Sequence, residues 1–415
     1  MRNNKSIYKF IDPKNIKYNY PLLEKGLSKV DLQKGINVLK TGFITMNKQT
    51  DMFEKEFAKK VKSKYALMVN SGSSANLLAT FASCNPLRKN RFERGDHALI
   101  PALCWSTSLW PLVQSGLKIK FVDIDPHTLN VNADYLISKI TKQTKVIMLI
   151  NVLGISTDVK KIVNFAKKKK IITIEDNCEA LGARLDKKYL GTIGDFGTYS
   201  FFYSHQITSG EGGMVVCNNK KDYEILLALR SHGWSRGKNV YAKNAKKYPN
   251  LDPRYIFINS GFNLRPTDIQ AAIGRSQFKR LDFFKKTRTM NKNKIINSLV
   301  KDKRWKGQFK FVKYSKRINP SYMVLPILLD IKFLDKKKKF IKLIEEKGLE
   351  TRPIISGSFV NQPSTKLYNL NPGNQKFNGA QKVQDQGFVI GLSTKKIDKK
   401  KIDFVTNVLF LIDII

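Results

Sequence analysis

The chain has 415 residues, of which 42% are hydrophobic and 11% aromatic. This length and composition exclude a disordered protein and allow one large core plus a second, smaller one. The formal net charge is +42, but the excess is mostly lysine and is spread along the whole chain, in runs such as 167–170 and 336–339. We expect a solvated basic surface that attracts anionic ligands. We expect no nucleic-acid partner, because nucleic-acid binders gather their basic residues on one element.

Neither a membrane span nor a secretory signal is predicted. The longest apolar stretches, 146–155 and 408–415, are too short to cross a bilayer, and the first 20 residues contain no continuous apolar run. The four cysteines, Cys84, Cys104, Cys178 and Cys217, form no Cys-x-x-Cys pair, which argues against a disulfide framework and a zinc site. The sequence therefore predicts a cytoplasmic protein with no bound metal and no membrane partner.

Short apolar runs alternate with helical patterns between residues 60 and 230. The expected strands are 65–70, 97–102, 118–122, 146–152, 171–175, 197–203 and 213–217. The expected helices are 74–83, a helix that begins at 106, 132–140, 159–168 and 223–229. Strands separated by helices of about ten residues predict an α/β fold, with a mostly parallel central sheet and helices on both faces.

The pattern changes after residue 230. A polar stretch over 233–253 is predicted to be a loop, and one long helix is expected over 267–286. A smaller α+β unit follows, with helices at 291–299, 336–346 and from 398, and strands at 322–329, 349–353 and near 387–390. We place the boundary between a large domain, 1–290, which includes an N-terminal arm, and a small C-terminal domain, 291–415.

Polar and aromatic residues follow three of the predicted strands. The segment Ser71-Gly72-Ser73-Ser74-Ala75-Asn76 lies between a strand and a helix, where backbone N–H groups and hydroxyls can close around an anion. Asp176 follows a buried strand, at the edge where parallel sheets build their sites, and Trp105 follows another strand. Read alone, the serine turn and Asp176 also fit helix caps, and Trp105 also fits the core.

The segment Ser200-Phe-Phe-Tyr-Ser-His205-Gln-Ile-Thr-Ser-Gly-Glu-Gly-Gly213 resembles the cofactor-attachment segment of the DegT/DnrJ/EryC1/StrS sugar aminotransferase family. The likeness includes Gly261–Ala272, runs from about residue 30 to 290, and continues more loosely through 351–363. It implies an aspartate-aminotransferase-like fold that binds pyridoxal phosphate (PLP) or pyridoxamine phosphate (PMP). Where the family has a lysine, this chain has His205. An imidazole cannot tether PLP, but with an ordinary pKa near 6.5 it can take and return a proton.

The resemblance also implies roles for other residues. Those implied to bind the cofactor are Gly72, Ser73, Ser74 and Ser200 at the phosphate, Trp105 flat against the pyridine, Asp176 at the pyridine nitrogen, and Glu179 near the 3-hydroxyl. Asn263 is implied to reach the partner's phosphate site, which implies a homodimer with shared active sites. His232 and Arg236 match a loop that reaches the sugar. For Arg236, a plain surface arginine is an equally good interpretation.

His205 is similar to the histidine of the family's dehydratase branch. We therefore expect a PLP/PMP-dependent 3-dehydratase of a GDP- or CDP-linked 4-keto-6-deoxy sugar, with His205 as the catalytic base and L-glutamate as the amino donor that regenerates PMP. Its 3,6-dideoxy product would serve surface polysaccharide synthesis. The family's enzyme for the CDP-linked sugar carries an iron–sulfur cluster on cysteines. No cysteine follows Cys217 here, so no cluster is expected.

Three alternatives remain open at this stage. The first is a nucleotide-sugar aminotransferase that works without the lysine. The second is a catalytically inactive homologue that only binds ligand, because loss of the lysine also fits decay. The third is a nucleic-acid binder, which the net charge alone would suggest.

Overall fold

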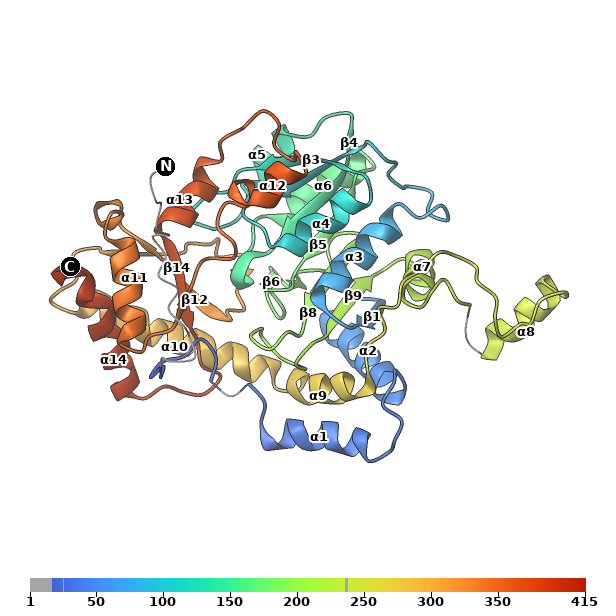
Figure 1. The fold of residues 1–415 in the computed structure, drawn as a ribbon, viewed down its shortest axis with the longest axis horizontal. Coiled ribbons are helices and arrows are strands. Elements are labelled where there is room, and N and C mark those ends of the chain that lie inside the picture. The colour runs from blue at the N-terminus through green and yellow to red at the C-terminus, as the bar shows by residue number, and fades with distance from the viewer. Residues whose placement is uncertain (1–16, 25, 236–237) are drawn as a thin grey trace, which may run out of the picture.

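A seven-stranded sheet forms the centre of the computed structural model, which describes residues 17–24, 26–235 and 238–415 (Figure 1). Its strands, in spatial order, are β1 (Tyr65–Val69), β9 (Gly213–Cys217), β8 (Phe196–Ser200), β5 (Ile172–Asp176), β4 (Thr144–Ile150), β2 (His97–Pro101) and β3 (Lys118–Val122). Neighbouring strands are parallel except for the two pairs that involve β9. The predicted mostly parallel sheet is confirmed.

Helices cover both faces of this sheet, as predicted. The helices of this part of the chain are α1 (Lys29–Leu39), α2 (Lys48–Val61), α3 (Gly72–Ser83), α4 (Ser106–Gln114), α5 (Ala133–Ser138), α6 (Val159–Lys168), α7 (Lys220–Arg230), α8 (Lys238–Lys247), α9 (Asp268–Phe278) and α10 (Leu281–Lys301). Side chains alternate across a strand. In β1, Leu67 packs in the same cluster as α3, whereas Met68 packs with the phenyl rings of Phe53 and Phe57 from α2.

The C-terminal part builds a second, smaller sheet and core beside the first (Figure 1). Its antiparallel strands, in spatial order, are β10 (Phe309–Phe311), β12 (Val324–Leu329), β14 (Gly387–Gly391) and β13 (Thr351–Arg352), and its helices are α11 (Lys337–Glu346), α12 (Pro363–Leu367), α13 (Asn378–Gln386) and α14 (Lys399–Leu409). A third sheet joins β6 (Arg184–Leu185) and β7 (Lys188–Tyr189) to β11 (Ile318–Asn319). The domain boundary at residue 290 stays a prediction, and helix α10 runs through that position.

Two predicted elements are wrong. The stretch 233–253 is not all loop, because it contains α8, a lysine-rich helix that stands away from the body of the protein (Figure 1). A helix in that position needs no apolar face, so hydrophobic periodicity could not predict it. The expected single helix over 267–286 is interrupted between Phe278 and Leu281, where the guanidinium of Arg280 binds the buried carboxylate of Asp31 from α1.

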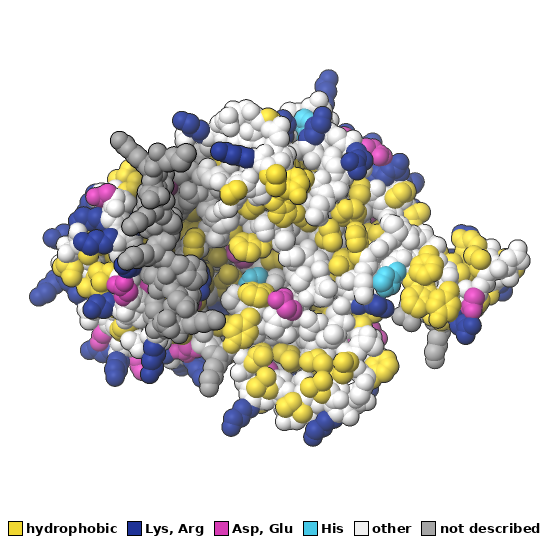
Figure 2. Space-filling view, viewed as in Figure 1, with side chains coloured by type: hydrophobic (Ala, Val, Ile, Leu, Met, Phe, Trp, Pro, Cys, Tyr) yellow, Lys and Arg dark blue, Asp and Glu magenta, His cyan; other side chains and the backbone are white. Residues whose placement is uncertain are grey.

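Basic side chains are widely separated on the visible surface. On the face shown in Figure 2, Lys and Arg side chains are scattered around the outline, whereas hydrophobic side chains gather along α1. Within the described residues, no helix is long and apolar enough to cross a membrane.

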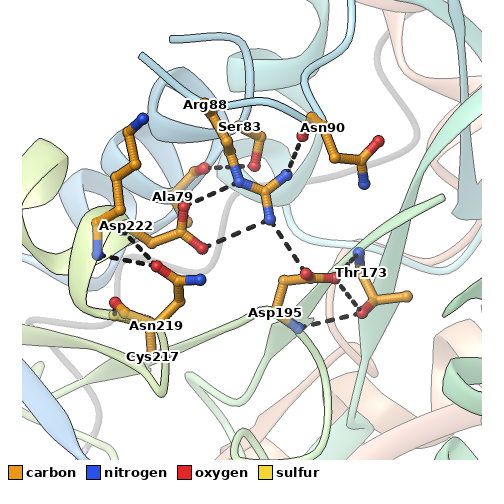
Figure 3. A network of polar contacts seen from close by, with 10 residues as sticks. Ala79, Ser83, Arg88, Asn90, Thr173, Asp195, Cys217, Asn219 and Asp222 are labelled. Atoms are coloured by element: carbon orange, nitrogen blue, oxygen red, sulfur yellow. Dashed lines mark hydrogen bonds and ion pairs between the residues drawn. The ribbon is translucent and has the colours of Figure 1, made fainter. Parts of the chain in front are cut away.

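A buried ion-pair network lies at the amino-terminal ends of the central strands (Figure 3). The Arg88 guanidinium donates from Nε to Asp222 at 2.9 Å and from Nη2 to Asp195 at 3.1 Å. Asp195 in turn accepts from the N–H and hydroxyl of Thr173 at the start of β5, both at 2.9 Å. The network joins the α3–β2 loop to α7 and the sheet, on the side away from the carboxyl ends of the strands.

Candidate functional site

A cavity of about 520 Å³ opens at the carboxyl ends of the central strands. Asp176 ends β5 and Ser200 ends β8, and both line it. The smaller sheet contributes further walls, including Val324 from β12, Arg352 from β13 and Val389 from β14. Seven predicted site residues meet here: Gly72, Ser73, Trp105, Asp176, Glu179, Ser200 and His205.

The amino-terminal end of α3 forms one wall. Ser71 caps the helix, and its Oγ accepts from the Ser74 N–H at 3.1 Å. Gly72 lies so close to β8 that a Cβ at this position would stand 2.5 Å from the Ser200 Cβ. Only glycine fits this close approach, and it leaves the first N–H groups of the helix near the Ser200 hydroxyl. This is a setting for an anion such as a phosphate.

The Asp176 carboxylate, 4% exposed, is held by three donors. Its Oδ2 accepts from the Asn76 side chain and the Ser108 hydroxyl, both at 2.7 Å, and its Oδ1 accepts from the Cys178 N–H at 3.0 Å. Asn76 is itself fixed by the Thr198 hydroxyl at 2.6 Å. Donors on both oxygens hold the carboxylate group in one orientation at the edge of the cavity.

Glu179 lies just beyond Asp176. Its carboxylate accepts from the Leu153 N–H at 3.1 Å, and Leu153 has a positive φ of 51°. Burial raises the pKa of Glu179 to about 7, and the neighbouring Asp176 adds to this increase. At neutral pH a substantial part of Glu179 is therefore protonated and can donate a hydrogen bond.

The His205 imidazole lines the cavity without a hydrogen bond at Nδ1. That atom is buried and has no partner among the described residues, while the ring lies edge-on to Phe202 with centroids 5.9 Å apart. Burial lowers the pKa of His205 to about 4, a hydrogen bond to the Ser200 backbone and the charge of Asp176 oppose this, and the Arg288 charge acts in the same direction as burial. The expected pKa near 6.5 is thus corrected. The imidazole is neutral at pH 7, ready to accept a proton but not to donate one.

Trp105 is 55% exposed although it is a large aromatic residue. It lines the cavity as the N-cap residue of α4, so it does not belong to the core as the alternative interpretation held. An exposed indole beside a cavity offers a flat apolar face to a planar ligand.

Three predicted site residues, Ser74, Asn263 and His232, do not line the cavity. Ser74 lies one residue further into α3, and its hydroxyl is 3.0 Å from that of Ser71. The side-chain oxygen of Asn263 accepts a hydrogen bond from the Arg265 guanidinium at 3.0 Å. The exposed His232 has a φ of 64°, and its backbone N–H donates to the Phe262 carbonyl. Arg236 lies outside the described residues.

Three residues of the site were missed by sequence reasoning. Asn76 and Ser108 orient Asp176, and Arg352 brings a guanidinium to the cavity wall, where its Nη2 donates to Glu350 at 2.8 Å. Asn76 ends the serine-glycine segment 71–76, and Arg352 lies in the segment 351–363 that resembled the family. These were the available signals for them.

Together these groups fit PLP. A helix N-terminus with serine hydroxyls fits a phosphate, a fixed carboxylate fits a protonated pyridine nitrogen, and an exposed indole fits a planar ring. The His205 imidazole lines the same cavity and fits a group that exchanges a proton there. Within the described part of the chain, no group of His, Cys, Asp and Glu is arranged to hold a metal ion.

Comparisons with known proteins agree with this geometry. A profile of the DegT/DnrJ/EryC1/StrS aminotransferase family matches residues 27–410. The GDP-4-keto-6-deoxy-D-mannose 3-dehydratase of Yersinia pseudotuberculosis is 35% identical over 84% of this chain and 87% of its own length.

Two crystal structures of a dehydratase of this name also superimpose on the chain. One, a variant with bound GDP-perosamine, has a TM-score of 0.84 at 31% identity and covers 94% of this chain and 100% of its own. The other, with a trapped adduct of PLP and glutamate, has a TM-score of 0.81 at 30% identity and covers 94% and 100%.

Proposed function

The chain belongs to the DegT/DnrJ/EryC1/StrS aminotransferase family, and we propose that it is a PLP/PMP-dependent 3-dehydratase of a nucleotide-linked 4-keto-6-deoxy sugar. One observation carries the proposal. The cavity presents the neutral imidazole of His205, and none of its described lining residues is a lysine, in a chain with 75 Lys and Arg residues. Aminotransferases hold PLP through a lysine amine. A base without an amine suits the removal of a hydroxyl instead.

We assign the cofactor contacts from the residues upward. Gly72, Ser73 and Ser200 would hold the phosphate at the amino-terminal end of α3, with Ser74 in the same turn. Asp176 would pair with the pyridine nitrogen, Trp105 would stack on the ring, and Glu179 would contact the 3-hydroxyl. When bound, PMP supplies an amine for the C4 ketone and a conjugated ring that accepts electrons.

His205 is the proposed catalytic base. Its neutral imidazole would take the proton whose loss drives departure of the C3 hydroxyl, and the same ring would return a proton when glutamate restores PMP. The low pKa keeps the free base available across the neutral range. It also makes the imidazolium a strong acid once formed, which favours rapid return of the proton.

Arg352 gives the proposed site a positive charge. It is the one lysine or arginine among the described lining residues, and it stands on the wall formed by the smaller sheet. A guanidinium binds carboxylates and phosphates through paired N–H donors. Arg352 would therefore anchor an anionic group, either the carboxylate of L-glutamate or the diphosphate of the sugar nucleotide. The names of the relatives favour GDP over CDP as that nucleotide.

We further propose a homodimer with shared active sites. Helix α1 and the segment after it expose Val30, Leu32, Ile36, Leu39 and Phe43, with exposed fractions between 42% and 63%. An apolar face of this kind suits a second copy of the chain. Asn263 and His232 do not line the cavity of their own chain, so a role for them, and for Arg236, is proposed in the partner's site.

The test is product analysis with the purified protein, PLP and glutamate. GDP- and CDP-linked 4-keto-6-deoxy sugars are incubated side by side, and the products are examined by mass spectrometry together with an ammonia assay. The proposal predicts a 3-deoxy sugar and one equivalent of free ammonia. A stable amino sugar as the main product would establish the aminotransferase alternative, and no cofactor-linked absorbance would establish the inactive homologue.

Two variants separate the role of His205 from a general loss of binding. His205→Asn keeps a polar side chain but cannot take the proton, so turnover should stop while PLP absorbance remains. His205→Lys should hold PLP in a bond that borohydride makes permanent, and dehydration should be suppressed. Turnover by His205→Asn at the native rate would contradict the assignment of the base.

A further inference from the structure

Among the largest fully buried side chains of the described residues is a charged one, Arg288 of α10. It is 2% exposed, and all three of its guanidinium nitrogens donate to backbone carbonyls. Nη1 donates to Gln206 at 2.8 Å, Nη2 to His205 at 3.3 Å, and Nε to Leu392 at 3.2 Å. Among the ion pairs of the described residues, none includes Arg288.

Burying the Arg288 guanidinium in this way costs folding free energy. A buried cation with no carboxylate partner costs free energy that neutral carbonyls offset only in part. Burial accordingly lowers the pKa of Arg288 to about 10, which still leaves it charged at pH 7. A smaller neutral side chain would cost less free energy to bury. The three donors and the charge of Arg288 are therefore expected to have a function.

The carbonyls that Arg288 binds identify that function. The His205 Nδ1 has no hydrogen-bond partner among the described residues, and the imidazole is held by a hydrogen bond to the Ser200 backbone and by the segment that carries it. Arg288 binds the carbonyls of His205 and of the next residue, Gln206. The Gln206 side chain then donates to the carbonyls of Glu179 and Ser321, the latter at 3.0 Å. The third carbonyl, that of Leu392, follows β14, whose Val389 lines the cavity.

We propose that Arg288 is the positioning residue for His205: it fixes the segment that carries the base and ties it to the end of β14. The proposal rests on the proposed function for its catalytic meaning. Arg288 touches neither substrate nor cofactor in this scheme and acts through His205 alone. Its triple donation gives the segment one defined position relative to both sheets.

The charge of Arg288 has a second effect on the base. Burial is the largest cause of the low pKa of His205, Asp176 at the end of β5 raises that pKa, and Arg288 lowers it further. The other charged groups that line the cavity are Glu179, Glu211 and Arg352. Arg288 therefore positions His205 and also helps to keep it neutral.

The test uses three variants and two readouts. Arg288→Met removes both charge and donors, Arg288→Lys keeps the charge but not the three-way fork, and Asn291→Ala is the matched control. Asn291 lies on the same helix and donates to the carbonyls of Ser393 and Lys395, not to the His205 segment. The readouts are kcat and KM of the PLP-loaded enzyme, and the His205 pKa from NMR of the cofactor-free protein with labelled histidine.

Arg288→Met should lower kcat by about 10- to 100-fold, with KM changed little, because the base is misplaced and not the substrate. The His205 pKa should rise only slightly, because burial, the largest cause of its low value, remains. Arg288→Lys should keep the low pKa and show an intermediate kcat. Asn291→Ala should match the native protein in both. If Arg288→Met does not fold, an Arg288→Lys protein with native kcat overturns the proposal, as does a folded Arg288→Met with native kcat and native His205 pKa.

These outcomes stay separate from the proposed function. The NMR readout involves neither sugar nor cofactor, and product analysis of the native protein involves no variant. If the native protein made an amino sugar while Arg288→Met raised the His205 pKa, the positioning role would stand and the dehydratase would not.

Discussion

Burial of the His205 imidazole should make the stability of the protein depend on pH in a way that one substitution removes. In the folded state the pKa is about 4, whereas an unfolded chain has about 6.5. Because the folded pKa is the lower one, the unfolded state binds the proton more readily. The cost is therefore absent above about pH 6.5, grows as the pH falls, and is complete below about pH 4, where it amounts to about 3 kcal/mol.

His205→Asn cannot bind this proton in either state. Between about pH 7.5 and about pH 5, the native protein should lose about 2 kcal/mol more unfolding free energy than the variant. The measurement is urea unfolding of the cofactor-free protein at both pH values, followed by tryptophan fluorescence. All other titratable groups are shared by the two proteins and cancel in the difference.

The matched control is His127→Asn, which removes an exposed histidine that does not line the cavity. It shows how much pH dependence the loss of any histidine produces. The reasoning is refuted if the difference in stability between native protein and His205→Asn is the same at both pH values. The imidazole would then not be buried in its neutral form.

Three further substitutions test other parts of the structure. Arg88→Met leaves the carboxylates of Asp195 and Asp222 without their cation and should lower the unfolding free energy, measured in urea, by about 3–5 kcal/mol. Adding Asp222→Asn should restore part of this loss. Gly72→Ala places a Cβ 2.5 Å from the Ser200 Cβ and should weaken PLP binding by about tenfold or more in a fluorescence titration, whereas Gly373→Ala, in open space, should not. Arg352→Gln should raise KM for glutamate or for the sugar nucleotide by about tenfold and change kcat less, and an unchanged KM for both would remove its assigned role.

The elements of the large domain were predictable where the local hydrophobic pattern and the general rules of α/β folds indicate the same element. Strands such as 118–122 and 213–217 are short runs with apolar residues, and both appear with the predicted bounds. Asp176 was predictable because parallel strands deliver polar residues to one edge of their sheet. His205 was predictable from its neighbours in sequence, since its segment is continuous.

The remaining features depend on contacts between distant segments. The Asn76 side chain donates to Asp176, which lies 100 positions later in the chain, and no local sequence pattern around Asn76 indicates that contact. The low pKa of His205 and the raised pKa of Glu179 arise from packing, which sequence neighbours do not determine. The sequence of helix α8 is much less amphipathic than that of α6, so the periodicity that predicted α6 gave no comparable signal there.

Desolvation in this cavity acts on whichever group is placed in it. It lowers the pKa of the base His205 and raises that of the acid Glu179, because burial penalises charge of either sign. A lysine at position 205 would experience the same penalty, and its amine would become neutral and nucleophilic. The surroundings that would make a lysine reactive toward PLP thus make a histidine an available base. In our interpretation, the exchange of one side chain within an otherwise shared cavity changes the reaction from amino transfer to dehydration.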